Sequence, residues 1–230
     1  MDVRNGTSFY AEDVLAIPNK GMNEIIREKH IYKYVKRFLD FTLSLLGLIV
    51  LSPVFLIISI LIKRESDGPI FFKHKRIGKN GKEIYLYKFR SMVPNAEELI
   101  KKFTPEQMKE FKENFKLEND PRITKIGKWL RKTSLDELPQ LINILKGELS
   151  IIGPRPVIEE ELEKYGNNKE KFLSVTPGLT GYWAANGRSD TTYEQRMQME
   201  LYYVDNISFK MDLKVFFKTI ISVLKKEGAR

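Results

Sequence analysis

The residues of this 230-residue chain that are best suited to chemistry lie within one short stretch. Two adjacent carboxylates, Asp136 and Glu137, follow Ser134 and precede an apolar run. Arg131 lies just before them, and Arg155 stands between two prolines after the run. Guanidinium groups pair with phosphate oxygens, and carboxylates ligate hard divalent cations. The spacing therefore indicates a site for phosphate and a divalent cation, where one carboxylate could attack while the other orients or deprotonates a second reactant.

The segment 134–137 also has a purely structural interpretation. Serine followed three residues later by glutamate, just before an apolar run, is the pattern of a helix capping box. Acidic residues also favour a helix N-terminus through the helix dipole. The neighbouring guanidinium groups favour the chemical interpretation, because a helix N-terminus surrounded by cations attracts phosphate. We expect the two carboxylates on the first turn of a helix.

Composition limits the chemistry further. The chain has no cysteine, which excludes thiol catalysis, disulfides and thiolate metal sites. Its only histidines, His30 and His74, are too far apart in sequence to suggest a local ligand pair. An essential metal should therefore be a hard, oxygen-binding cation, Mg²⁺ with Mn²⁺ as the alternative. The net charge of +9 predicts an anionic partner, which could be nucleic acid, anionic lipid or a phosphorylated substrate.

An apolar segment at 38–62 must place this chemistry near a membrane. It has 25 residues and a single charge, Asp40, so it is long enough to span a bilayer. However, Ser52 and Pro53 divide it into parts of 15 and 10 residues, each too short to span alone. Basic residues flank both ends and favour the same side of the membrane: Lys33, Lys36, Arg37, Lys63 and Arg64. We expect a re-entrant helix-break-helix over 33–62, with a spanning helix as the alternative.

The remaining sequence predicts an α+β, mostly helical domain over 63–230. Short strands are expected at 70–72 and 83–89, because Asn80-Gly81 between them is a strong hairpin-turn signal. The basic excess around this hairpin suits contact with lipid phosphates.

Two amphipathic helical stretches complete the pattern. One covers 96–119 and is broken at Pro105, and the other covers 207–226. The second could pack on the core or lie on the bilayer surface, and its pattern suits both. Residues 1–32 are expected to be a leader that runs into an amphipathic helix.

Eight short motifs occur in a fixed order from about residue 33 to the C-terminus. They are Lys36-Arg37-x-x-Asp40, Ser52-Pro53, Phe71-x-x-x-x-Arg76-x-Gly78, Tyr87-Lys88-Phe89-Arg90-Ser91-Met92, Asp120-Pro121-Arg122-Ile123-Thr124, Ser134-Leu135-Asp136-Glu137-Leu138-Pro139-Gln140, Gly153-Pro154-Arg155-Pro156 and Pro177-Gly178-Leu179-Thr180-Gly181. This ordered set resembles the small monotopic phosphoglycosyl transferases, the bacterial sugar transferases that start glycan assembly on undecaprenyl phosphate. No single motif is diagnostic, but the set is specific.

The resemblance implies a function and a location. Such an enzyme transfers a phospho-sugar from a UDP-sugar to undecaprenyl phosphate and releases UMP, which initiates capsule, exopolysaccharide or glycoconjugate assembly. It lies on the bacterial inner membrane, here with 63–230 as the catalytic domain on the cytoplasmic face. Asp136 matches the family's nucleophile, which forms a phosphosugar-aspartyl intermediate, and Glu137 matches its partner. Mg²⁺ held partly by this dyad would screen the charge of the attacked diphosphate.

The resemblance also suggests substrate-binding residues. Arg131 matches a phosphate-contacting arginine of the family, and Arg155 is a second candidate. Arg90 and Arg76 are further candidates, although either could instead hold the fold to the lipid headgroups. Three residues lie where the family is thought to contact nucleotide or sugar, namely Trp183, Asn186 and Arg188. Trp183 could equally be a core aromatic.

Two alternatives stay open from the sequence. The first is a basic, membrane-attached binding or scaffold protein for an anionic polymer. Aromatic and basic residues alternate around Tyr87, but the sequence has no nucleic-acid motif and we expect no nucleic-acid partner. The second is direct one-step transfer without a covalent intermediate. The sequence does not identify the sugar, and only a loose resemblance to family members that handle galactose or glucose points to either of these.

Overall fold

The computed structural model describes residues 22–114, 117, 120–187 and 191–224. The chain forms two units, 1–36 and 37–230. The second unit contains the whole apolar segment, 38–62, and everything that follows it. Of the predicted leader, residues 1–21 lie outside the described part of the chain.

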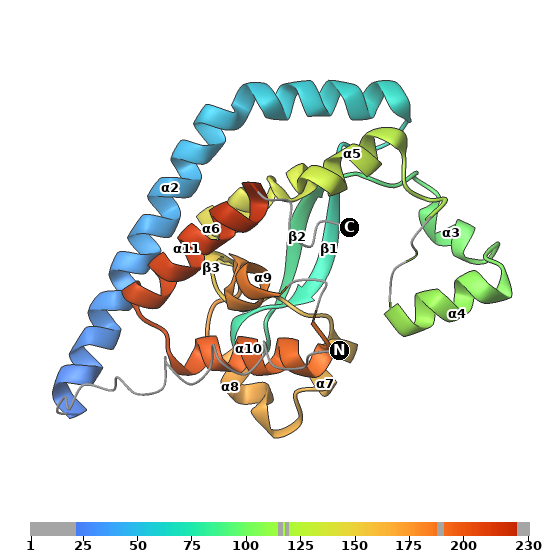
Figure 1. Ribbon diagram of the computed structural model, residues 1–230. Helices are drawn as coiled ribbons and strands as arrows, with labels where there is room; N and C mark the ends of the chain where they lie inside the picture. The colour runs from blue at the N-terminus through green and yellow to red at the C-terminus, as the bar shows by residue number, and fades with distance from the viewer. Residues whose placement is uncertain (1–21, 115–116, 118–119, 188–190, 225–230) are drawn as a thin grey trace. The chain divides into compact units, whose positions relative to one another are not determined.

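The predicted apolar helix is present as α2, Met22–Glu65. It continues through Pro53 instead of ending there. Proline has no N–H to donate to the carbonyl four residues earlier, and the hydroxyl of Ser52 donates to that carbonyl, Ile49 O, at 2.8 Å. This bond compensates for the one that Pro53 lacks, and Figure 1 shows α2 bending along its length. By length and composition, residues His30–Glu65 could cross a membrane.

The predicted hairpin is confirmed. Strands β1, Phe71–Ile77, and β2, Glu83–Phe89, pair antiparallel from Phe71 opposite Phe89 to Ile77 opposite Glu83. The turn between them is the short 3₁₀ helix η1, Lys79–Gly81, in which Asn80 has φ 56° and Gly81 has φ 76°. Asparagine and glycine tolerate this left-handed conformation best, so the turn chemistry sets the register. Strand β1 extends five residues beyond the predicted end at residue 72.

A second, parallel pair of strands positions the later motifs. Strand β3, Ser150–Ile152, pairs with β4, Gly178–Thr180. A Cβ atom on Gly178 would lie 2.1 Å from Gly153 N, and one on Gly153 would lie 2.6 Å from Thr176 O. Glycine is therefore required at both positions for the two backbones to approach this closely. The contact brings the segment around Arg155 against the segment that follows Pro177.

The remaining elements are helices, which confirms a mostly helical α+β fold (Figure 1). The α-helices are α3 Ala96–Ile100, α4 Pro105–Asn114, α5 Lys125–Thr133, α6 Gln140–Lys146, α7 Glu159–Glu163, α8 Lys169–Leu173, α9 Tyr182–Asn186, α10 Tyr193–Asp205 and α11 Phe209–Leu224. Two further 3₁₀ helices are η2 Leu135–Glu137 and η3 Gly166–Asn168. The predicted break at Pro105 is confirmed, since α3 ends before it and α4 begins at it.

Within the second unit, α2 is attached to the rest by charged groups as well as apolar contacts. Arg37 donates to the carbonyl of Leu145 at 2.7 Å, near the C-terminal end of α6. The carboxylate of Asp40 accepts a hydrogen bond from Ile151 N at 2.9 Å. Leucines of α2 pack on a core formed by β2, α6 and the residues before β3: Ile84, Leu86, Leu141, Ile144 and Leu149, with Leu48 and Leu51 from α2. Asp40, the single acidic residue of the apolar segment, thus joins α2 to strand β3.

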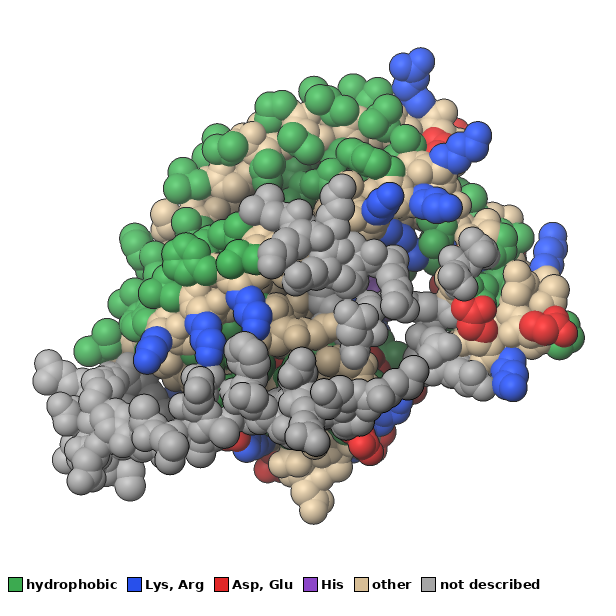
Figure 2. All heavy atoms as spheres, in the orientation of Figure 1, with side chains coloured by type: hydrophobic (Ala, Val, Ile, Leu, Met, Phe, Trp, Pro, Cys, Tyr) green, Lys and Arg blue, Asp and Glu red, His purple; other side chains and the backbone are tan. Residues whose placement is uncertain are grey.

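Helix α11 has two apolar faces. One face packs on the core through Met211 and Val215, which lie in a cluster with Ile152, Tyr182 and Tyr203. The other leaves large apolar side chains exposed: Leu213, Phe216, Phe217, Ile220 and Ile221. Figure 2 shows hydrophobic side chains covering much of the visible surface of α2 and α11. The sequence left open whether this helix packs on the core, and the structure shows that it does so with one face only.

Candidate active site

The predicted dyad lies on a tight turn between two helices. Helix α5, Lys125–Thr133, is capped at its start by Thr124, whose hydroxyl accepts from Gly127 N at 2.9 Å, and at its end by the backbone of Ser134. Ser134 has φ 57° and makes no side-chain capping bond, so the capping-box interpretation is wrong. Asp136 and Glu137 follow on the 3₁₀ turn η2, before α6, and not on the first turn of an α-helix.

Asp136 is almost fully buried, with 8% of its surface exposed. Burial raises the pKa of its carboxyl group to about 6, because the ionised form loses water. The negative charge of Glu137 adds to this rise in pKa, whereas the cations of Lys88 and Arg131 oppose it. Asp136 is thus a carboxylate whose charge is poorly hydrated, as suits a nucleophile.

Glu137 is paired with a residue that the sequence analysis did not select. Its Oε1 accepts from Lys88 Nζ at 2.6 Å, and both side chains are largely buried. Side chains of a strand point alternately to its two faces, so Lys88 lies on the same face of β2 as the buried Ile84 and Leu86. This alternation is the sequence pattern that could have identified Lys88. A lysine on the inward face of a strand requires a buried acidic partner.

Arg131, predicted to contact phosphate, lies beside the dyad. Its Nε donates to Ser91 Oγ at 2.9 Å, which fixes the guanidinium against the segment after β2. Burial lowers the pKa of Arg131, and the carboxylates of Asp136 and Asp120 act against that shift. Asp120 in turn holds Arg122 through two bonds of 2.8 and 2.6 Å. The negative charge of Asp120 thus acts on both Arg122 and Arg131.

A small pocket next to Glu137 brings together residues far apart in the sequence. Its lining comes from β1, β2, the dyad, α6, the Pro-Arg-Pro turn and β4: Arg76, Leu86, Lys88, Glu137, Gln140, Arg155, Pro156, Gly178 and Leu179. Three of these residues are cations, and two of them, Arg76 and Arg155, are candidates from the sequence. The pocket is therefore suited to a ligand with more than one negative charge.

Arg90 does not line this pocket. Its guanidinium donates to Ser66 O at 2.7 Å, to Ser66 Oγ at 3.0 Å and to the carbonyl of Asp67. These bonds join the end of β2 to the residues just after α2. The contacts are those of a residue that holds the fold together, whereas the sequence analysis expected Arg90 to contact either substrate or the lipid headgroups.

Trp183 lies near the pocket, but Asn186 is occupied by neighbours. The ring of Trp183 is partly exposed, its Nε1 donates to Thr191 Oγ1 at 2.7 Å, and the guanidinium of Arg155 lies 5.9 Å from its centre. It is therefore not a core aromatic. Asn186 donates to Tyr182 O at 2.6 Å and accepts from Lys218. Arg188 lies outside the described residues.

Comparison with known proteins identifies the family. The model of the bacterial sugar transferase family matches residues 31–226, almost all of the chain. The chain belongs to the bacterial sugar transferase family. The resemblance found from the eight motifs is thus confirmed.

Three relatives of this chain have informative names. It is 44% identical to the UDP-galactose-lipid carrier transferase of Erwinia amylovora, over 97% of this chain and 48% of that protein. It is 42% identical to the undecaprenyl-phosphate galactose phosphotransferase of Salmonella typhimurium, over 86% of this chain and 42% of that protein. It is 45% identical to the exopolysaccharide production protein ExoY of Sinorhizobium fredii, over 84% of this chain and 87% of that protein. The chain spans about half the length of the first two relatives.

The two carboxylates of the dyad, Asp136 and Glu137, fit one kind of metal. Among the described residues, no group of three or more His, Cys, Asp or Glu side chains could enclose an ion. Mg²⁺ keeps several waters and binds through one or two carboxylates together with substrate phosphates. Asp136 and Glu137, next to a cationic pocket, are such an incomplete donor set.

Proposed function

We propose that this protein transfers a phospho-sugar from a UDP-sugar to undecaprenyl phosphate, releases UMP and so initiates membrane glycan assembly. The proposal is carried by one observation: Asp136 and Glu137 lie beside a pocket lined by Arg76, Lys88 and Arg155 in a chain of the bacterial sugar transferase family. The names of the relatives, which include a UDP-galactose-lipid carrier transferase, an undecaprenyl-phosphate galactose phosphotransferase and an exopolysaccharide production protein, support this substrate class.

In the first step, Asp136 is the nucleophile. A carboxylate oxygen of Asp136 attacks the sugar-bearing phosphorus of the UDP-sugar. The bond from that phosphorus to the bridging oxygen breaks, and UMP leaves with the electron pair. The sugar phosphate remains on Asp136 as a mixed anhydride. Burial of Asp136 favours this attack, because a poorly hydrated carboxylate loses little hydration when it reacts.

The cations of the site offset the repulsion between Asp136 and an anionic diphosphate. Arg131 acts on Asp136 directly, and Arg76 and Arg155 line the adjoining pocket. Their charges are fixed before the substrate arrives, which lowers the reorganisation that the reaction requires. Mg²⁺, with Mn²⁺ as the alternative, would be held by Asp136 and Glu137 and would neutralise charge on the diphosphate.

In the second step, the acceptor phosphate displaces Asp136. An oxygen of undecaprenyl phosphate attacks the same phosphorus, and the aspartyl oxygen leaves as the carboxylate. Glu137, oriented by Lys88, assists by accepting the proton of an acceptor phosphate that is still protonated. Two sequential displacements allow UMP to leave before the second anion enters.

Because the proposed acceptor is a lipid, the exposed apolar surfaces of α2 and α11 are assigned to contact with the membrane. We propose that α2 enters one leaflet of the bacterial inner membrane and returns, so that the catalytic domain lies on the cytoplasmic face. Basic residues at both ends of the apolar segment and the proline within it support this re-entrant path. The exposed apolar face of α11 would then lie against the same leaflet.

The purified protein in detergent tests the proposal. With undecaprenyl phosphate, Mg²⁺ and a panel of UDP-sugars, at least one sugar should give UMP, and EDTA should abolish its release until Mg²⁺ is restored. Lys132→Ala is a matched control, because Lys132 is exposed and lies between Arg131 and the dyad. If no UDP-sugar yields UMP, the enzymatic proposal fails and a binding or scaffold protein is favoured.

A further inference from the structure

Two positively charged side chains of the pocket, Arg76 and Arg155, repel each other and need a negative charge to hold them in place. Arg76, on β1, and Arg155, after β3, both line the pocket. Burial, together with the positive charge of Arg155, lowers the pKa of Arg76 to about 10. Without a compensating anion, the long side chain of Arg76 would turn away from the pocket.

Glu161 supplies that anion from outside the pocket. It lies on α7, and its Oε2 accepts from Arg76 Nη1 at 3.2 Å. The same oxygen accepts from Ile158 N at 3.2 Å, at the start of α7. Glu161 does not line the pocket, and 16% of its side chain is exposed; the pocket residue to which it bonds is Arg76.

The other oxygen of Glu161 is held by Arg196 of α10. Arg196 Nη1 donates to Glu161 Oε1 at 2.9 Å, and Arg196 itself is 8% exposed. Its guanidinium lies 4.9 Å from the ring centre of Trp183 and 5.1 Å from that of Tyr193. With its guanidinium placed against both rings, Arg196 keeps Glu161 from rotating.

We propose that Glu161 is a positioning residue, which holds the guanidinium of Arg76 in the pocket where it meets the phosphates of the nucleotide sugar. This inference rests on the proposed function, because it takes the ligand to be a nucleoside diphosphate. A guanidinium that is already fixed loses little conformational freedom when it binds phosphate. Removal of the carboxylate would free Arg76 and leave it repelled by Arg155, so affinity for the diphosphate would fall.

A double-mutant cycle on the full chain in detergent tests this, with UDP as the probe of binding. Glu161→Gln should raise the Kd for UDP about tenfold, which is ~1.4 kcal/mol. Arg76→Gln should cause a similar loss. The double variant should bind no more weakly than Arg76→Gln alone, because Glu161 acts through Arg76. In turnover, Glu161→Gln should raise KM for the UDP-sugar more than it lowers kcat.

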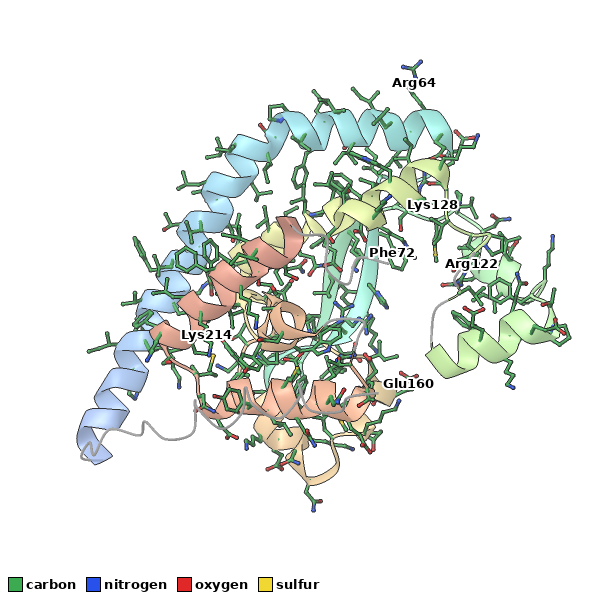
Figure 3. All side chains as sticks on the ribbon, viewed as in Figure 1. Arg64, Phe72, Arg122, Lys128, Glu160 and Lys214 are labelled. Carbon is green, nitrogen blue, oxygen red and sulfur yellow. The ribbon has the colours of Figure 1, made fainter. Side chains whose placement is uncertain are left out.

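Two further variants protect the test against misfolding. Glu161→Asp keeps the buried charge but shortens its reach to Arg76, so the Kd should rise several-fold while the protein stays folded, and it can replace Glu161→Gln in the cycle. Glu160→Gln, at the neighbouring exposed position labelled in Figure 3, should leave the Kd unchanged.

The outcomes separate this inference from the proposed function. If wild-type protein binds UDP and releases UMP, but the losses from Glu161 and Arg76 multiply, Glu161 is only structural and the inference is wrong. An unchanged Kd in Glu161→Gln or Glu161→Asp would overturn it equally. If wild-type protein neither binds UDP nor releases UMP from any UDP-sugar, the proposed function fails and the inference fails with it.

Discussion

At the scale of single residues, Asp136 is placed where its charge destabilises the fold. Burial raises its pKa from 3.8 to about 6, so ionisation is harder in the folded chain than in the unfolded chain. The unfolded chain therefore releases this proton first, and the stability of the fold decreases as pH rises from about 4 to about 6. In the proposed mechanism this poorly hydrated carboxylate is the nucleophile, and the cations of Lys88 and Arg131 partly offset the rise in its pKa.

The first prediction concerns stability. Asp136→Asn should raise the free energy of unfolding in metal-free buffer at pH 8 by about 2–3 kcal/mol, because it removes the buried charge. The gain should be smaller at pH 4.5, where Asp136 is protonated in the fold. Thermal unfolding at the two pH values measures this, with Glu160→Gln as the exposed control. An equal gain at both pH values would mean that the charge is not responsible.

The second prediction concerns the phosphate-binding arginine. Arg131→Lys keeps the charge but loses the planar pair of donors and the bond to Ser91, so UMP release should fall at least tenfold. Lys132→Ala should stay close to the wild-type rate. A rate for Arg131→Ala within about twofold of wild type would show that Arg131 belongs only to the basic surface.

At the scale of elements, α2 combines a long apolar sequence with an interrupted backbone hydrogen bond at Pro53. Pro53 leaves Ile49 O without its helical donor, and Ser52 supplies another. Such an interruption allows a helix to bend without exposing an unpaired carbonyl to lipid. At the two ends of the apolar segment, Arg37 bonds to α6 and Arg64, labelled in Figure 3, is exposed. The proposed re-entrant path requires such a bend between the two ends.

The third prediction tests this topology. Single cysteines at Asn5 and Asn167, in a chain that has no natural cysteine, should label from the same side of sealed vesicles. Pro53→Ala restores the amide donor, and it should straighten α2 and shift part of the population to a spanning form. Labelling of the two cysteines from opposite sides in the wild-type background would contradict the re-entrant path.

At the scale of the whole molecule, local sequence patterns predicted secondary-structure elements well but did not predict contacts between residues far apart in the sequence. The hairpin followed from Asn80-Gly81, and the break before α4 followed from Pro105, because each depends on neighbouring residues only. The pairing of Lys88 with Glu137 spans 49 residues and could be inferred only from an inward-facing lysine. The capping-box interpretation failed because Ser134 is left-handed, which its sequence neighbours do not determine.

The family motifs located the site, but not the framework that supports it. Arg76 and Arg155 could be named as candidates, and the structure places both in one pocket with Glu137. Glu161, which holds Arg76, is 85 residues away from it in the sequence. This contact follows from tertiary packing alone. Residues that touch the substrate leave a local signature, whereas those that position them are known only from the fold.

The most direct test of this account is the mass of the peptide that contains Asp136. After incubation with a UDP-sugar and Mg²⁺ but no lipid acceptor, a rapid acid quench should reveal an increase of one sugar phosphate on that peptide. Asp136→Asn should lose both the adduct and UMP release, whereas Glu137→Gln should turn over slowly and keep the adduct. Undecaprenyl phosphate added before the quench should discharge it. Full turnover with no adduct under any quench, together with intersecting initial-rate lines for the two substrates, would contradict the covalent mechanism and favour one-step transfer.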